Sequence, residues 1–107
     1  MKYKIVYNVN PPSKIYNVNE LEEKYFNSLY SALTNFENEK IILHRFSNGS
    51  IEPYFNSFPL GKIKLQGRKH YMQVFKSEFK YENIDGTVDD FILKIPDVIK
   101  YLRKYCK

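Results

Sequence analysis

The sequence predicts one α+β domain over residues 1–107: a two-layer sandwich with two helices on one face of a mostly antiparallel sheet of four to five strands. Three observations predict this class. Several short segments alternate apolar and polar residues, as half-buried strands do. Two longer segments repeat apolar residues at helical spacing. Glycine-containing pairs typical of hairpin turns separate neighbouring strand segments. The expected order of elements is β-α-β-β-β-β-α.

The N-terminal segment predicts the first strand. Apolar side chains occupy every second position from Tyr3 to Val9, which places them on one face of an extended chain. Pro11 and Pro12 follow and end the strand, because proline has no N–H to donate to a neighbouring strand.

The first helix is expected to begin at Asn19. The side chains of Asn19 and Glu22 are spaced as a capping box, which satisfies the free backbone N–H groups at the start of a helix. Asn17 with Glu20 is an equivalent alternative start. Apolar residues then recur at helical spacing, and the helix is expected to end within residues 35–38.

Two strand segments, residues 40–46 and 50–55, flank Asn48 and Gly49, a pair that is the strongest short signal for a hairpin. A two-residue turn there gives a register with two apolar pairs and one pair of opposite charges. These pairs are Phe46 with Ile51, Ile42 with Phe55, and Arg45 with Glu52. Pro53 predicts that the second strand lies at an edge of the sheet.

Residues 59–61 form a short connector to a second predicted hairpin, residues 62–75, which we call the basic hairpin. A two-residue turn at Gly67 and Arg68 places one set of residues on an apolar face. That register pairs Leu65 with His70, Ile63 with Met72, and Gly61 with Val74. A helix over residues 68–81 is an alternative, because the aromatic residues of that segment also follow helical spacing.

The C-terminal segment predicts a helix. Residues 83–86 form a turn, and Thr87 caps the helix with Asp90 at the third position. Apolar residues keep helical spacing from Val88 to Cys106. Pro96 lies inside this run and must kink or restart the helix, because it removes one backbone hydrogen bond and clashes with the preceding turn.

Composition favours a cytoplasmic protein with an anionic partner. The net charge is +5 and the isoelectric point is about 9.2, which suits nucleic acid or an acidic protein surface and argues against a mimic of nucleic acid. The single Cys106 excludes an internal disulfide, and no segment has the length and apolarity of a signal peptide or membrane span. An abundance of residues with AT-rich codons (Lys, Asn, Ile and Tyr) indicates a low-GC bacterium, or a phage or mobile element living in one.

The basic hairpin provides the candidate binding site. Residues 53–77 contain no Asp or Glu, and aromatic residues alternate there with basic ones. The side chains expected to bind nucleic acid or a partner are Lys62, Lys64, Gln66, Arg68, Lys69, Tyr71 and Gln73. The lysines are suited to a phosphate backbone and the tyrosine to stacking on a base. The alternative is a solvated sheet face on which lysines deter edge-to-edge pairing.

Catalysis is the second interpretation. The four residues Arg68, Lys69, His70 and Tyr71 contain the group types that metal-independent RNA cleavage needs. Neighbours in a strand point to opposite faces, however, and the expected registers turn both His44 and His70 toward the apolar side. No His or Cys spacing is typical of a metal site, so neither a metal nor another cofactor is expected.

The leading hypothesis is therefore a small non-enzymatic binding protein. It engages nucleic acid, or a protein complex that handles nucleic acid, through the basic hairpin, as a regulator or an inhibitor of a host defence nuclease does. A small metal-independent ribonuclease of toxin type is one alternative. A protein–protein interaction module that uses exposed tyrosines is the other.

Overall fold

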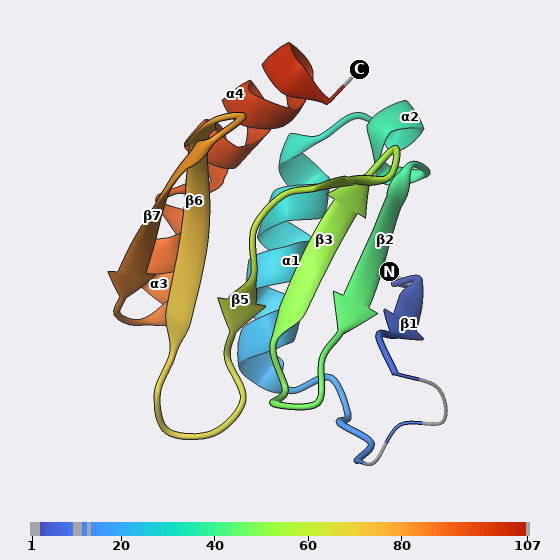
Figure 1. The fold of residues 1–107 in the computed structure, drawn as a ribbon, viewed down its shortest axis with the longest axis vertical. Helices are drawn as coiled ribbons and strands as arrows, with labels where there is room; N and C mark the ends of the chain where they lie inside the picture. Colours follow the sequence, from blue (N-terminus) through green and yellow to red (C-terminus); the bar gives the residue numbers. More distant parts are fainter. Residues whose placement is uncertain (1–2, 10–11, 13, 107) are drawn as a thin grey trace.

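A computed structural model describes residues 3–9, 12 and 14–106 and confirms a mixed α+β architecture (Figure 1). Its helices are α1 (Glu20–Ala32), α2 (Asn35–Asn38), α3 (Val88–Ile92) and α4 (Ile95–Tyr105). Its strands are β1 (Ile5–Tyr7), β2 (Ile41–Arg45), β3 (Ile51–Phe55), β4 (Phe58–Pro59), β5 (Ile63–Lys64), β6 (Tyr71–Ser77) and β7 (Lys80–Asp85).

The strands form one sheet in the order β1-β2-β3-β5-β6-β7, and β4 also pairs with β3. The expected four to five strands are too few, because short strands and the β6–β7 hairpin escape the alternation pattern. The first pairing, β1 with β2, is parallel and the others are antiparallel. Helix α1 makes the crossover between the two parallel strands, as parallel pairing requires.

The helices α1, α3 and α4 cover one face of the sheet and leave the other open (Figure 1). The core lies between these layers. Phe26 and Leu29 of α1, Phe91 of α3, and Leu43 and Val74 of the sheet are completely buried. Burying a side chain of this size stabilises the fold by roughly 1.5–3 kcal/mol. The face of the sheet opposite α1 is called the open face below.

The predicted helix starts are confirmed. Asn19 accepts a hydrogen bond from Glu22 N, and Asn19 N donates in return to the Glu22 carboxylate, so the capping box exists as expected and the alternative start at Asn17 does not. Thr87 caps α3 with Asp90 in the same way. Pro96 restarts the chain as α4. The expected end of the first helix is wrong, because Thr34 caps a separate short helix, α2.

The expected register of β2 with β3 is wrong by one residue. Arg45 pairs with Ile51, His44 with Glu52, and Ile41 with Phe55. The cause is a three-residue loop instead of a two-residue one: Phe46 N bonds Ser50 O, and Gly49 N bonds Phe46 O. Gly49 has a φ of 91°, which suits the residue that closes such a loop. The shift turns Arg45 into the core and His44 out of it.

A further hairpin precedes the expected connector at residues 59–61 and overlaps it at Pro59. Asn56 and Ser57, both with positive φ, form a tight turn between β3 and β4. Strand β3 is therefore interior, with β2 on one side and β4 and β5 on the other, and the expected edge position of Pro53 is wrong. Pro53 has no N–H to donate on the β4–β5 side, but its carbonyl still accepts from Leu60 N at 2.9 Å.

In the basic hairpin the central pair, Ile63 with Met72, is confirmed. The expected two-residue turn is wrong, because residues 65–70 all lie outside the strands and form a wider loop. The alternative helix over residues 68–81 is excluded by strand β6. The expected turn at residues 83–86 is also wrong in part, because β7 continues to Asp85.

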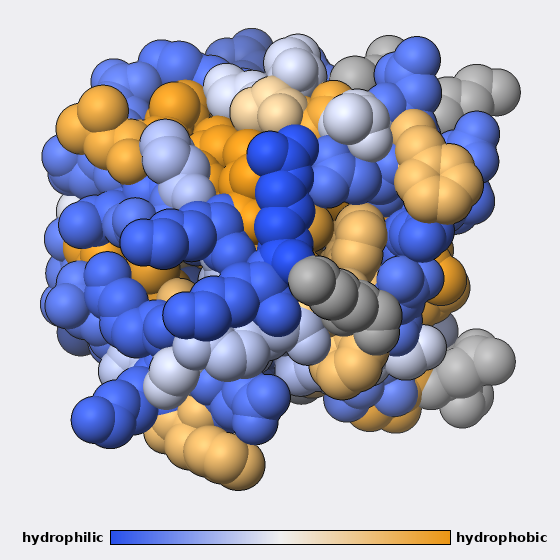
Figure 2. Space-filling model, turned by 90° about the horizontal axis from the view of Figure 1, so that it is seen from above, coloured by the Kyte–Doolittle hydropathy of each residue, from blue (hydrophilic) through white to orange (hydrophobic). Residues whose placement is uncertain are grey.

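The end of the molecule that carries α2 and the C-terminal part of α4 has an apolar hollow, visible from above in Figure 2. Its volume is about 380 Å³. The lining residues are Phe36, Glu37, Lys40, Phe55, Asn56, Leu102, Arg103 and Cys106. Among the described residues, no helix is long and apolar enough to cross a membrane.

An ion pair on the rim of this hollow joins α2 to α4. Arg103 donates to the Glu37 carboxylate through Nε (3.0 Å) and Nη2 (2.9 Å). The bonds from Arg103, and then the one from the Thr34 backbone, lower the pKa of Glu37 to about 2. The carboxylate therefore contributes stability above the ordinary pKa of 4.5, and this contribution is lost as the pH falls toward about 2.

We expect Glu37→Gln to unfold at a lower temperature than wild type near neutral pH, because the glutamine keeps the cap at Thr34 but loses the charge. The difference in Tm should shrink between about pH 4.5 and pH 2, where wild type also loses the charge. Thermal unfolding of both proteins across this range measures it. A difference in Tm that stays constant with pH would show that the carboxylate does not titrate as the geometry requires.

Candidate nucleic-acid interface

The structure places the seven predicted site residues in three different environments. Lys62 and Lys64 flank the buried Ile63 in the chain, so both project from the open face of the sheet. Tyr71 is the cross-strand partner of Lys64 and lies on the same face. Arg68 and Lys69 are exposed in the loop that joins β5 to β6.

The two glutamines of the predicted site are tied to the fold. The Gln73 side chain accepts a hydrogen bond from Lys62 N at 3.1 Å and so links β6 to β5. The Gln66 amide donates to Asn17 O and to Glu22 Oε1, both at 2.9 Å. These contacts give Gln66 and Gln73 a structural role, and they fix the backbone that carries the lysines.

The cations of this region are available to an anionic ligand. Within the described part of the chain, no carboxylate oxygen lies within 4.0 Å of the side-chain nitrogens of the cationic residues Lys14, Lys62, Lys64, Arg68 and Lys69. The four ion pairs found there involve other residues. A local excess of unneutralised positive charge attracts polyanions over several ångströms.

A cleft of about 540 Å³ opens beside Lys64. The lining residues are Lys14, Ile15, Tyr16, Asn17, Asn48, Lys64, Gln66 and Gly67. The lining contains two lysines, three side-chain amides and one phenol ring, but no carboxylate. Lys14 lies over the Tyr16 ring, with its Nζ 4.8 Å from the ring centroid. This chemistry suits an anion that also offers hydrogen-bonding groups.

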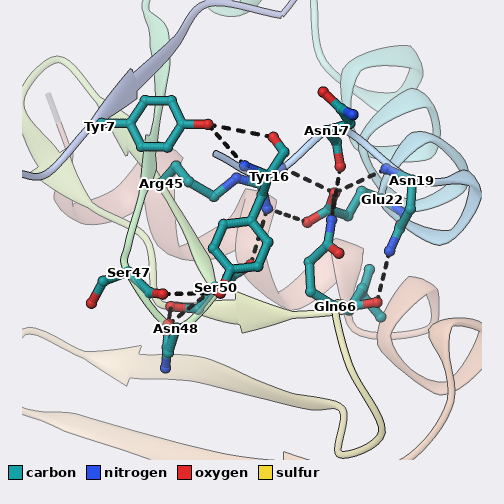
Figure 3. A network of polar contacts seen from close by, with 12 residues as sticks. Tyr7, Tyr16, Asn17, Asn19, Glu22, Arg45, Ser47, Asn48, Ser50 and Gln66 are labelled. Atoms are coloured by element: carbon teal, nitrogen blue, oxygen red, sulfur yellow. Dashed lines mark hydrogen bonds and ion pairs between the residues drawn. The ribbon is translucent and has the colours of Figure 1, made fainter. Parts of the chain in front are cut away.

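The wall of the cleft is held by a buried ion pair that the sequence pattern does not predict (Figure 3). Arg45 and Glu22 have side chains that are 0% and 1% exposed. Arg45 Nη1 donates to Glu22 Oε2 at 2.6 Å, and Nη2 donates to Oε1 at 3.2 Å. Arg45 Nη1 also donates to Gly49 O at 3.0 Å, which fixes the β2–β3 loop. The pair therefore links α1, β2 and the loop that carries Asn48.

The same network ties down the segment that precedes α1. Tyr16 N donates to the Tyr7 hydroxyl at 3.0 Å, and the Tyr16 hydroxyl donates to Ser47 O at 3.0 Å (Figure 3). The Asn19 amide donates to Leu65 O at 3.0 Å. Tyr16 and Asn17 are thus connected to β1, to the β2–β3 loop and, through the bond from Gln66 to Asn17 O, to the basic hairpin.

Glu52 is a nearly buried carboxylate on the open face. It does not pair with Arg45, as the expected register required; its Oε2 accepts from Gly61 N at 3.2 Å. Burial raises the pKa of Glu52 above its ordinary value, against smaller opposing effects of the Gly61 N–H and of Lys62.

One of the two histidines does not lie as expected. His44 is on the open face, where its ring lies 4.0 Å from that of Tyr54 between centroids. His70 is partly buried, and its Nε2 lies 2.9 Å from Gly67 O, within its own loop. No group of three or more His, Cys, Asp or Glu among the described residues could hold a metal ion.

Sequence reasoning missed Lys14, Tyr16, Asn17 and Asn48 of the cleft, and Phe46 and His44 of the open face. The sequence pattern assigns Asn48 only to a turn. The expected register places Phe46 and His44 on the apolar face instead of the open face. No local pattern marks residues 14–17, because only the tertiary fold brings them next to Lys64.

Similarity to known proteins gives no further guide to the function of this interface. Comparisons with protein-family models, with curated proteins and with solved structures found no match to this chain. The function must therefore be inferred from the residues and contacts described above.

Proposed function

We propose that this protein binds nucleic acid through the basic hairpin and the adjoining cleft, without a cofactor. The main support for this proposal is a group of five cations that have no carboxylate partner among the described residues. These cations lie next to a cleft whose lining contains no carboxylate. Nucleic acid carries one negative charge per nucleotide, so several phosphates can be contacted at once.

The alternatives have weaker support. Ribonuclease activity at His70 needs a proton-transfer group that faces the lysines, whereas the contact that His70 Nε2 makes is with Gly67 O, within its own loop. An acidic protein surface is a partner that the same cations could bind. Nucleic acid accounts better for the aromatic rings that accompany the lysines, because bases offer stacking faces.

We expect charge reversal at Lys62, Lys64 and Lys69 to abolish most binding of a short fluorescein-labelled oligonucleotide, measured by fluorescence anisotropy. For wild type, the logarithm of the affinity should fall linearly with the logarithm of the salt concentration. In the triple lysine-to-glutamate variant this slope should become shallower by about three, because three phosphates are no longer neutralised by a lysine. The thermal stability should change little, because these side chains are partly or fully exposed.

A matched control is charge reversal at Lys80, Lys100 and Lys104, which are exposed and lie outside the interface. It changes the net charge equally, so a general loss of attraction would affect both variants alike. Binding that is equally weak in both would refute a local site. Wild-type protein that binds no oligonucleotide at low salt would refute the proposed function, and degradation of an RNA oligonucleotide that disappears in His70→Gln would favour the ribonuclease.

A further inference from the structure

A row of side chains crosses the open face from β2 to β6. Phe46 faces Ser50 through the hydrogen bond from its N–H to Ser50 O. Ser50 and Lys64 lie one position beyond the pair Ile51–Ile63, and Lys64 pairs with Tyr71. Phe46 and Tyr71 therefore stand at the two ends of this row, with Lys64 between them.

Both rings are partly exposed, and the helices that cover the sheet lie on its other face (Figure 1). A lysine accompanies each ring. Lys62 Nζ lies 4.3 Å from the centroid of the Phe46 ring, and Lys64 is the cross-strand neighbour of Tyr71. Aromatic rings and cations thus alternate on one surface, which is the arrangement that proteins use for single-stranded nucleic acids: bases stack on the rings while the cations contact the backbone.

The separation of the strands that carry Phe46 and Tyr71 favours a ligand whose bases are splayed apart. The backbones of Phe46 and Tyr71 are three strand spacings apart, and at about 4.8 Å per spacing this amounts to roughly 14 Å. Neighbouring bases of a duplex rise by about 3.4 Å and cover both faces of one another. Each ring can stack on a base only if the bases are splayed apart, which a single strand permits.

The carboxylates of the open face indicate which path a bound nucleic-acid strand takes across it. Asp85 of β7 lies opposite Tyr71 and is exposed, so the β7 side of Tyr71 repels phosphates. Glu52 is nearly buried, and its carboxylate accepts a hydrogen bond from Gly61 N. The path from Tyr71 across β5 toward Phe46 contains Lys64 and Lys62 and is the more favourable one.

We propose that the ligand of this interface is single-stranded nucleic acid, with one base stacked on Tyr71, another on Phe46, and the connecting backbone on Lys64 and Lys62. This inference rests on the proposed function and specifies its ligand. It differs from binding by charge alone, because a purely electrostatic site accepts duplex and single strand alike.

The test compares a single-stranded oligonucleotide with the duplex of the same sequence, both labelled with fluorescein and measured by anisotropy at the same salt concentration. We expect wild type to prefer the single strand. Combining Tyr71→Leu with Phe46→Leu should weaken single-strand binding by at least about tenfold, because neither base can then stack on a ring while the side chains remain apolar. The rescue variant, Tyr71→Phe with Phe46→Tyr, keeps both rings and should bind as wild type does.

The matched control combines Phe79→Leu with Tyr81→Leu, which removes two exposed aromatic rings outside this row. Urea unfolding of each variant shows whether it is folded at the temperature of the binding measurement. Equal affinity of wild type for duplex and single strand, or a folded leucine variant that binds like the control, would overturn the inference and leave the proposed function standing. Absence of binding to either probe would instead overturn the proposed function.

Discussion

Replacing Arg45 by methionine is expected to lower the free energy of unfolding by about 3–5 kcal/mol, because it leaves the Glu22 carboxylate buried without its positive partner. The Glu22 side chain is 1% exposed, so water cannot replace the guanidinium. The substitution also removes the donor to Gly49 O, and with it a support of the β2–β3 loop. Urea unfolding measures the change.

A double-mutant cycle separates the ion pair from ordinary packing. Glu22→Gln keeps a side chain that can still cap Asn19 N, and combined with Arg45→Met it leaves no buried charge. The double variant should therefore be more stable than Arg45→Met alone, although a second native side chain has been replaced. Destabilisations that simply add would show that the two side chains are not energetically coupled.

Local features of this fold could be predicted from the sequence because their causes are local. The capping boxes at Asn19 and Thr87 each depend on residues three positions apart, and both exist. A helix restarts at Pro96 because the proline ring removes a backbone N–H and clashes with the preceding turn. The pair Ile63–Met72 follows from alternation on both sides of one loop.

The register of β2 with β3 could not be predicted in the same way. Asn48-Gly49 marks a turn but does not fix whether the loop has two residues or three, and one residue exchanges the faces of the whole strand. The opposite charges of Arg45 and Glu52 favour the wrong choice, since an exposed pair avoids the desolvation that a buried arginine requires. Glu22, whose sequence pattern indicates a cap, is the true partner, and only the tertiary fold shows that it has two roles.

The candidate site could be predicted only in part, because one part of it depends on local alternation and the other on the tertiary fold. Lys62, Lys64 and Tyr71 lie on one face because strand alternation places them there. The cleft beside them is formed by residues 14–17, which reach it through hydrogen bonds to distant elements. A pattern within the basic hairpin contains no information about that segment.

Gly61→Ala is expected to be the other strongly destabilising substitution, with a decrease of about 2–6 kcal/mol in the free energy of unfolding. Gly61 has a φ of 101°, which is strained for any residue with a Cβ, at about 1–3 kcal/mol. A Cβ there would lie 2.5 Å from the backbone oxygen of Gln73, and the crowding adds about 1–3 kcal/mol because strand β6 would have to move.

Gly67→Ala provides the matched control for this prediction. Gly67 also has a positive φ, 75°, but a Cβ there would meet only Lys64 Nζ at 4.0 Å, an ordinary contact. The Gly67→Ala variant should be destabilised only by the backbone strain, about 1 kcal/mol. The difference between the two variants in urea unfolding therefore measures the close approach of β6 to Gly61, the point at which Gly61 N also holds Glu52. Equal destabilisation would mean that the two strands can separate freely there, and the positions of Lys62 and Gln73 on the open face would then not be fixed by this contact.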